Sequence, residues 1–298
     1  MSNHEQETGD LPLHSQETEL EILKSLAPGI TNRVMLDVGA STGLFASYFA
    51  SMGWEVHAFE PCPEVFAKLS AHLANMPNVR CYPLALTDRD GSATLHIAVR
   101  SDGTLMDMYH TLVPYKPTPE FQWGGIDEVR CLRLDSACAS LGITRRPGLL
   151  KIDTEGNDYR VLKGLGELLP EVIMVEFWDD AHPFGRCPSP PHLMIDLLRE
   201  RGYRDFFFIT RNGEDELVQI NTQRLRPGDW GNIISVHESA AELVYAVMPT
   251  VVLRSQQRLL SLLTMYRTAA RERLEAIRQL KNPLTFLWKA LWQRTSTR

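Results

Sequence analysis

The sequence predicts a doubly wound, mostly parallel α/β fold, and three observations support this prediction. Strand-like and helix-like stretches alternate repeatedly after residue 33. Several of the predicted strands are continuous apolar runs, such as VIMVEF at residues 172–177, which is typical of a sheet covered by helices on both faces. The first predicted strand, at residues 34–38, runs directly into a glycine-containing turn. Since ligands of such sheets bind beyond the carboxyl ends of the strands, functional residues are expected just after each strand.

The individual elements follow from apolar periodicity and from helix and strand breakers. A short helix is expected at residues 17–26, before the Pro-Gly pair at residues 28–29. Strands are expected at residues 34–38, 55–59, 79–86, 93–99, 149–152, 172–177, 206–209 and 232–236. Helices are expected at residues 44–52, 63–74, 159–169 and 193–201. Residues 100–127 show little periodicity and many Gly, Pro and aromatic residues, so they predict an irregular insertion, either a substrate-facing loop or a plain surface loop.

The charge of the chain is unevenly distributed. The 298 residues carry a formal net charge of −6, which argues against a general affinity for nucleic acid. Residues 251–298, however, contain ten Lys or Arg and two Asp or Glu, so a basic tail follows an acidic body. The five cysteines form no C-x-x-C pair, which favours a reducing cytoplasm over a disulfide framework. With neither a signal peptide nor a membrane-spanning segment expected, the sequence predicts a cytoplasmic protein.

The turn after the first strand, in VMLDVGASTG at residues 34–43, contains Gly39 and Gly43 in a G-x-x-x-G spacing. A dinucleotide site would need G-x-G-x-x-G and a phosphate loop would need Gly-Lys-Ser/Thr, and neither is present. Asp37 lies two residues before the first glycine, where its carboxylate disfavours a pyrophosphate and favours a cation. S-adenosylmethionine carries a sulfonium and an ammonium and no phosphate, so it is the adenosine cofactor that suits this turn best.

A second acid supports an adenosine ligand. Glu60 follows the second strand, about twenty residues after the glycines, where a carboxylate can accept hydrogen bonds from both ribose hydroxyls. This feature is shared with NAD enzymes and does not separate the two cofactors. The alternatives are a strand-end cap for Asp37 and a solvated loop acid for Glu60.

Four stretches between Val34 and Trp178 resemble the FkbM family of S-adenosylmethionine-dependent methyltransferases. They are MLDVGASTG, VHAFEPCPEVFAKLSAHL, VRCYPLALTDRDGSATLHI and RLDSACASLGITRRPGLLKIDTEGNDYRVLKGLGELL. The resemblance implies a seven-stranded, Rossmann-like class I methyltransferase fold and, usually, methylation of a hydroxyl on a sugar or a secondary metabolite. The cofactor contacts expected from the motifs are Asp37, Gly39, Ala40, Ser41, Gly43, Glu60, Leu86, Thr87 and Asp153.

A hydroxyl acceptor must lose its proton, so the chain needs a base near the methyl group. Asp153 is the first candidate because it follows the strand at residues 149–152, and strand alternation places Lys151 on its face of the sheet. Glu155 and Glu176 are further candidates, the alternatives being a helix cap for Glu155 and a strand-end acid bonded to backbone for Glu176. His182 is the fourth candidate and can equally be a surface residue.

Two further histidines and a possible metal site are less strongly indicated by the sequence. His110 lies in the irregular insertion and is a weaker candidate base, whereas His237 is expected to bond to backbone. Two acids and a histidine also suit Mg²⁺, but no H-x-x-x-H or D-x-D spacing is present, so a divalent metal is possible and not favoured.

The expected organisation has three parts: a disordered N-terminus at residues 1–16, a methyltransferase domain at residues 17–240, and a basic amphipathic helical extension at residues 241–298. An apolar stripe at residues 284–292 is flanked by basic residues and fits either packing on the domain or a second subunit, or peripheral contact with a membrane. The expected substrate is a small molecule or glycan and not a nucleic acid. Two rival functions remain: an NAD-dependent oxidoreductase, and a non-catalytic binding module on a methyltransferase fold.

Overall fold

The computed structural model describes residues 16–213, 215–221, 225–253, 264, 267–268 and 270–275. The chain forms two units, Met1–Val251 and Val252–Arg298. Among the described residues of the second unit, those between 264 and 275 are helical. The expected disorder of residues 1–15 and the apolar stripe at residues 284–292 lie outside the described residues.

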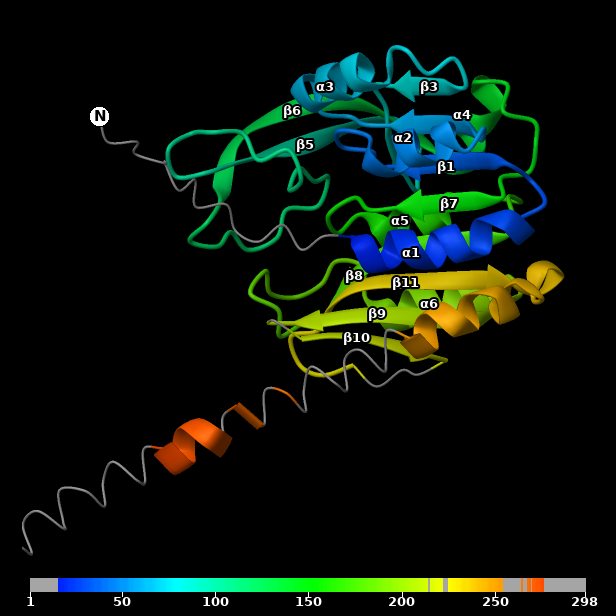
Figure 1. The fold of residues 1–298 in the computed structure, drawn as a ribbon. Helices are drawn as coiled ribbons and strands as arrows, with labels where there is room; N and C mark the ends of the chain where they lie inside the picture. The colour runs from blue at the N-terminus through cyan, green and yellow to red at the C-terminus, as the bar shows by residue number, and fades with distance from the viewer. Residues whose placement is uncertain are drawn as a thin grey trace, which may run out of the picture. The chain divides into compact units, whose positions relative to one another are not determined.

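An eight-stranded sheet forms the centre of the first unit, in the order β10-β9-β11-β8-β7-β1-β2-β3 (Figure 1). The strands of this sheet are β1 (Val34–Val38), β2 (Glu55–Phe59), β3 (Val79–Tyr82), β7 (Leu149–Ile152), β8 (Val172–Trp178), β9 (Tyr203–Asn212), β10 (Asp215–Ile220) and β11 (Trp230–His237). The strands from β3 to β8 pair in parallel, whereas β11, β9 and β10 pair antiparallel. The predicted doubly wound α/β fold is therefore confirmed.

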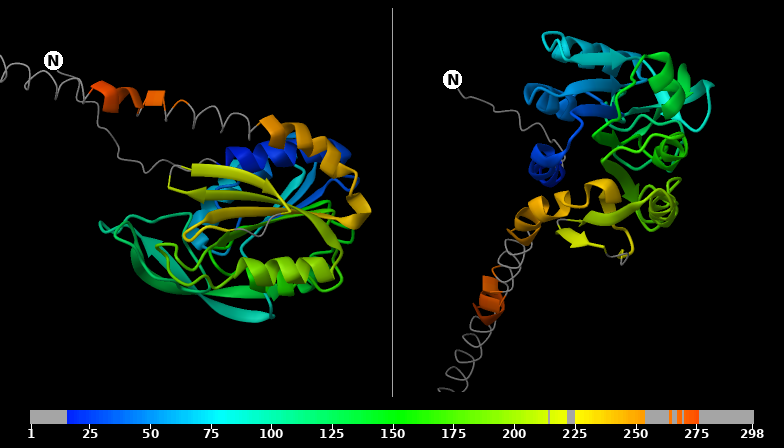
Figure 2. Two further views of the ribbon diagram at one scale, coloured as in Figure 1. Left: turned by 90° about the horizontal axis from the view of Figure 1, so that it is seen from below. Right: turned by 90° about the vertical axis from the view of Figure 1, so that its right-hand side faces the viewer.

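Helices cover both faces of this sheet. They are α1 (Glu17–Leu26), α2 (Leu44–Ser51), α3 (Pro63–Leu73), α4 (Leu134–Ser140), α5 (Asp158–Lys163) and α6 (Pro191–Glu200). Figure 2 shows α1 and the helical residues 243–251 on one face, with α5 and α6 on the other. Each face has its own apolar core: Met35 and Leu149 point toward α1 and α2, whereas Leu36 and Leu150 point toward α4, α5 and α6. The alternation of side chains along each strand thus separates two cores with one sheet.

A second, three-stranded sheet with the order β4-β6-β5 was not predicted. Its strands are β4 (Ala85–Thr87), β5 (Gly91–Val99) and β6 (Gln122–Arg133). The single strand expected at residues 79–86 is wrong, because the chain leaves the large sheet after β3 and enters this one at β4. Pro83 lies between the two strands, and proline cannot donate to a sheet ladder. The end of the expected irregular insertion is also regular, since β6 begins at Gln122.

The expected number of seven strands in the main sheet is also corrected, because β10 adds an eighth strand at the edge beside β9. The chain reverses between them at Gly213, whose φ of +60° suits glycine.

The helix expected at residues 159–169 is shorter than predicted, since α5 ends at Lys163. The helix at Leu134–Ser140 was missed altogether.

The compact unit continues past the predicted domain boundary at residue 240. Leu243, Val247 and Val251 are buried in the core that α1 and α2 share. Among the described residues, none of the helices combines the length and the apolar character that a bilayer crossing requires.

Candidate active site

The candidate site lies at the carboxyl edge of the parallel strands, on the face that α1 covers. Met35 and Leu149 point into the core under α1, so Asp37 and Lys151, two residues further along their strands, continue the same face. On β8, Met174 points the same way, and Glu176 follows it toward the edge. The apolar layer under α1 therefore becomes a polar layer where the strands end.

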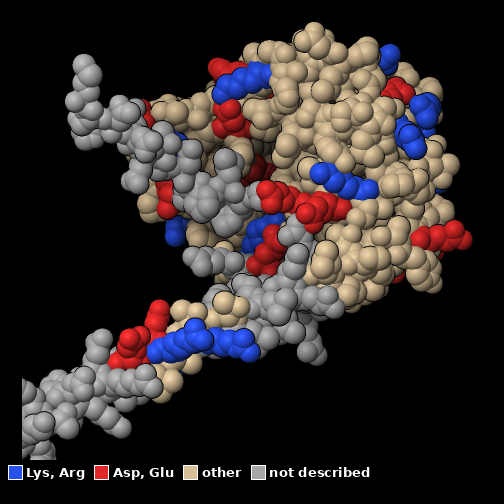
Figure 3. Space-filling view, viewed as in Figure 1, with Lys and Arg blue, Asp and Glu red and all other residues tan. Residues whose placement is uncertain are grey.

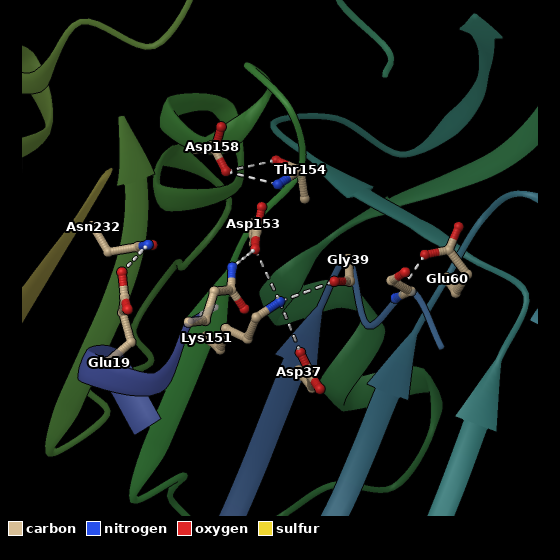
Figure 4. Close-up of polar contacts among 11 residues, drawn as sticks. Glu19, Asp37, Gly39, Glu60, Lys151, Asp153, Thr154, Asp158 and Asn232 are labelled. Carbon is tan, nitrogen blue, oxygen red and sulfur yellow. Dashed lines mark hydrogen bonds and ion pairs between the residues drawn. The ribbon is translucent and has the colours of Figure 1, made fainter. Parts of the chain in front are cut away.

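Lys151 is the centre of this polar layer (Figure 4). Its Nζ lies 3.3 Å from Asp37 Oδ1 and 3.5 Å from Asp153 Oδ2, and it donates to the carbonyl oxygen of Gly39 at 3.0 Å. Burial alone would lower the pKa of Lys151, but the carboxylates of Asp37 and Asp153 outweigh burial and raise it. Lys151 is therefore a charged, fully engaged cation between two acids.

The glycine turn packs directly against this cluster. Gly39 has a φ of +73°, and a Cβ at this position would overlap the carbonyl oxygen of Asp153. The backbone N–H groups of Gly39 and Ala40 both donate to the carbonyl oxygen of Phe59 at 3.0 Å. Gly43 has a φ of +92° at the start of α2. Glycine is thus required at residue 39 by close approach as well as by conformation.

Glu60 is held at the end of β2 by backbone. Its Oε2 accepts the N–H of Ser41 and its Oε1 accepts the N–H of Cys62, each at 3.0 Å. The residue is 6% exposed, so the solvated loop acid considered from the sequence is wrong. Burial raises the pKa of Glu60 to about 7, although both backbone N–H groups act in the opposite direction. Each carboxylate oxygen retains a lone pair for a further donor.

Leu86 and Thr87 lie on β4, and their side chains are turned into the protein. Leu86 belongs to the core under α4 and α5. Thr87 Oγ1 donates to Asn157 Oδ1 at 3.0 Å, and Asn157 Nδ2 donates to the carbonyl oxygen of Leu86 at 2.8 Å. These contacts tie β4 to the start of α5, so any contact of these two residues with a ligand has to be made through backbone.

Three carboxylates predicted as catalytic meet beyond the ends of β7 and β8. One oxygen each of Asp153, Glu155 and Glu176 lies within 4.8 Å of the others. Tyr115 donates its hydroxyl to Glu155 Oε2 at 3.3 Å, while Glu176 Oε2 is buried with no hydrogen-bond partner among the described residues. Burial, followed by the neighbouring acids, raises the pKa values of Glu155 and Glu176 well above their usual range. Such a group can share protons or hold a divalent cation.

The alternative role of Glu155 as a helix cap is wrong, because Asn157 holds the capping position of α5 and no side-chain capping hydrogen bond is made there. Asp158, the first residue of α5, instead binds the turn that precedes the helix. Asp158 Oδ1 accepts the N–H and the hydroxyl of Thr154 at 2.9 and 3.0 Å, and Oδ2 accepts the N–H of Gly156 at 2.9 Å. Burial raises the pKa of Asp158 to about 6. Glu155 itself has a φ of +54°, which is uncommon for a non-glycine residue, and its carboxylate accepts the Tyr115 hydroxyl.

The two loop histidines make no hydrogen bond or ion pair with these acids among the described residues. His182 Nδ1 accepts the N–H of Phe184 at 3.3 Å, and burial lowers the pKa of His182 to about 4. His110 Nδ1 accepts the N–H of Ala98 at 3.0 Å. His237 Nδ1 accepts the N–H of Ser239 at 3.1 Å, so its predicted bond to backbone is confirmed.

Aromatic side chains form a wall beside the three acids. The ring of Tyr115 stacks on Phe184 at 4.7 Å between centroids and contacts Trp123 and Trp178 edge to face. These residues come from the insertion, from β6, from the end of β8 and from the segment after it. The abundance of aromatic residues in the insertion was visible in the sequence, but their packing against Trp178 was not.

The fold and the site define a Rossmann-like α/β protein with a cluster of acids around Lys151 at the carboxyl edge of its sheet. The chain belongs to the FkbM methyltransferase family, since the Methyltransferase FkbM domain matches residues 37–204. The family assignment made from the motifs is thereby confirmed, and the chain is a methyltransferase.

Solved structures similar to this chain include several methyltransferases. A precorrin-6y C5,15-methyltransferase from Geobacter metallireducens GS-15 is 12% identical with a TM-score of 0.40, over 75% of this chain and 90% of the other. An O-methyltransferase from Bacillus cereus, in complex with SAH, is 13% identical with a TM-score of 0.42, over 77% and 83%. The bifunctional kinase-methyltransferase WbdD is 12% identical with a TM-score of 0.42, over 74% and 39%. A search of curated protein sequences finds no match.

Proposed function

We propose that this chain transfers the methyl group of S-adenosylmethionine to a hydroxyl of a saccharide or secondary metabolite. The observation that carries the proposal is the charge of the groups around Lys151 at the carboxyl edge. Lys151 is already paired with Asp37 and Asp153, and Glu60 adds a third carboxylate. This surplus of negative charge suits a sulfonium and an ammonium and disfavours a pyrophosphate.

The donor would be held by residues around the glycine turn. Asp37, Asp153 and the backbone at Gly39 and Ser41 surround the space for its charged end, and the free lone pairs of Glu60 suit two ribose hydroxyls. Ala40, Gly43 and the backbone of Leu86 and Thr87 complete the proposed set. When bound, S-adenosylmethionine supplies an electrophilic methyl group, and the chain supplies its position relative to the acceptor.

Asp153 is the proposed base. The side chain of Asp153 is 15% exposed, so an acceptor hydroxyl can reach it. The hydroxyl oxygen attacks the methyl carbon while its proton passes to a carboxylate oxygen of Asp153. Glu155 and Glu176 are proposed to bind further hydroxyls of the acceptor, because carboxyl groups accept hydrogen bonds from hydroxyls and, with pKa values raised by burial, more readily keep a proton to donate. His182 remains the alternative base, and its pKa of about 4 makes it neutral but weakly basic at pH 7.

The test uses S-adenosylmethionine carrying a labelled methyl group and the purified full chain. Label should enter a base-stable product when the chain is incubated with extracted glycans, lipids and metabolites. Calorimetry with S-adenosylhomocysteine should show binding, whereas NAD should show none. Binding of NAD alone would favour the oxidoreductase, and cofactor binding without transfer to any hydroxyl compound would favour the non-catalytic binding module.

The partners and location of the chain are proposed from its charge. On the face shown in Figure 3, the coloured acidic and basic residues lie in small groups among uncharged ones, which suits a small or glycan acceptor better than a nucleic acid. The basic residues of 251–298 support a cytoplasmic enzyme whose tail contacts an anionic membrane surface or a second subunit. Flotation with anionic liposomes, with and without residues 283–298, separates these two possibilities.

A further inference from the structure

The residue directly before α1 reaches into the candidate site. Gln16 occupies the position that caps a helix, yet its side chain makes no capping hydrogen bond. Instead, Gln16 Nε2 donates to Asp153 Oδ2 at 2.9 Å. A side chain that leaves its own helix terminus for a residue 137 positions away is placed there by the tertiary structure.

Asp153 is thereby held on one side only. Lys151 Nζ lies 3.5 Å from Oδ2, the same oxygen that accepts from Gln16. Among the described residues, Oδ1 of Asp153 makes no hydrogen bond or ion pair. Both contacts hold the oxygen Oδ2 in place and leave Oδ1 for a ligand.

The start of α1 is fixed by a buried ion pair. Glu19 is 0% exposed, and its two oxygens accept from Nη1 and Nη2 of Arg211 at 2.6 and 2.8 Å. Asn232 Nδ2 also donates to Glu19, at 2.9 Å, and Figure 4 shows this contact close to Asp153. Arg211 and Asn232 come from β9 and β11, so Glu19 joins α1 to the same edge of the sheet at which the acids lie.

Apolar side chains attach α1 in addition to this ion pair. Ile22, Leu23 and Leu26 lie on the same side of the helix as Glu19 and are fully buried in the core beneath it. Burial of such side chains contributes most of the docking energy, whereas a buried ion pair often adds little net stability over apolar residues. What a bidentate pair adds is a defined rotation and register. That register is the one at which Gln16 meets Asp153.

We infer that Gln16 is a positioning residue, which holds Asp153 so that Oδ1 faces the transferring methyl group and the acceptor hydroxyl. The pair of Glu19 and Arg211 sets α1 in the place from which Gln16 can do so. This inference rests on the proposed function, and it adds to the enzyme a helix that precedes the region matched by the family, which begins at residue 37.

The test compares Gln16→Leu with Glu17→Gln in the full chain. Leucine has a similar size but no donor, and Glu17 is exposed in the first turn of the same helix, so its substitution is a matched control. With labelled S-adenosylmethionine and the extract fraction that accepts label, Gln16→Leu should lower the rate at saturating donor about tenfold. The donor concentration for half-maximal rate should change less than about twofold. A loosened helix would instead raise that concentration, and an unchanged rate would overturn the inference.

A second measurement keeps this inference separate from the proposed function. In a double-mutant cycle, Gln16→Leu and Asp153→Ala should show an interaction of at least about threefold in the urea unfolding equilibrium. Label transfer to no acceptor by the wild-type chain would contradict the proposed function. Additivity of the two substitutions within about 1.5-fold would overturn the inference about Gln16, whether or not label is transferred.

Discussion

Two glutamates at opposite ends of β8 have opposite surroundings. Glu171 lies just before the strand and accepts three donors: the N–H of Thr31 at 3.0 Å, and the N–H and Nδ2 of Asn32 at 2.9 and 2.8 Å. Glu176, near the other end, has a buried oxygen with no hydrogen-bond partner among the described residues and other carboxyl groups around it. The same residue type is thus fully satisfied at one end of β8 and under-satisfied at the other.

The amino and carboxyl edges of the sheet therefore have different roles. At the amino edge, buried polar groups close loops and stabilise the fold, because each donor finds its acceptor. At the carboxyl edge, acids are crowded, burial raises the pKa values of Glu60, Glu155 and Glu176, and hydrogen-bonding capacity is left over. Such an arrangement costs folding free energy and is expected where a ligand supplies the missing partners.

The largest expected effect is on the carboxyl edge. Asp153→Asn removes the proposed base and should lower methyl transfer by about 10²- to 10⁴-fold, measured with labelled S-adenosylmethionine. His182→Asn is the comparison, and we expect less than a tenfold loss because His182 is a weak base that accepts a backbone N–H. A greater loss for His182→Asn than for Asp153→Asn would exchange their proposed roles.

The second effect contrasts the two glutamates directly. Glu171→Ala leaves three donors without an acceptor and should lower the free energy of unfolding by about 4 kcal/mol. Glu176→Gln keeps the shape of the side chain and removes a group crowded by acids, so its unfolding free energy should change by less than about 1 kcal/mol, in either direction. Urea unfolding of both variants is the measurement. Equal losses would show that the two edges do not differ in the way described.

The third effect is the pH dependence that Glu60 contributes. Its pKa is about 7 in the folded chain and near 4.5 when unfolded, so the folded state binds more protons between these values. The associated stability is fully present below about pH 4.5 and is lost as the pH rises through 7, by no more than about 3 kcal/mol. Urea unfolding at pH 5 and pH 8 should show this loss in the wild-type chain.

Ionisation of Glu60 should have the opposite effect on binding of the cofactor. Ionised Glu60 accepts ribose hydroxyls better than the protonated form, so binding of S-adenosylhomocysteine should strengthen between pH 6 and pH 8. Glu60→Gln is the control for both trends, because it has no proton to lose. A wild-type chain with the same two pH profiles as Glu60→Gln would contradict this assignment.

The smallest expected effect is that of chelation. The raised pKa values of Glu155 and Glu176 favour shared protons over a bound cation at neutral pH. Exhaustive chelation should therefore leave the rate of methyl transfer within about twofold of its starting value. A complete loss that Mg²⁺ restores would instead assign the cluster of Asp153, Glu155 and Glu176 to a metal.

Local patterns in the sequence were sufficient for the elements that position the site. The apolar runs and the glycine turn predicted β1, α2 and β2 to within a residue, because these elements bury alternating or helical faces against neighbours close in the chain. Strand alternation also placed Lys151 on the face of Asp153, and the strand-end rule placed Asp37 and Asp153 at the same edge of the sheet. Their contacts depend on adjacent parallel strands, whose order the family resemblance implied.

Features that depend on distant partners were not predictable in the same way. Pro83 looked like a residue within one strand, and only the pairing of β4 with β6 shows that the chain changes sheets there. Glu19 and Arg211 are 192 positions apart, and the sequence around neither residue predicts a buried ion pair between them. The sequence left Glu155 between a catalytic role and a helix cap, and only the structure shows that its carboxylate accepts from Tyr115, 40 positions away.

Two hydrogen bonds link the insertion to Glu155. The hydroxyl of Thr111 donates to the carbonyl oxygen of Glu155 at 2.6 Å, and the hydroxyl of Tyr115 reaches the carboxylate of the same residue. The segment that would meet an incoming acceptor is therefore fastened to a residue whose backbone is in an uncommon conformation. An acceptor that displaced that segment would therefore also move Glu155. Recognition of the acceptor and placement of the acids would then be coupled.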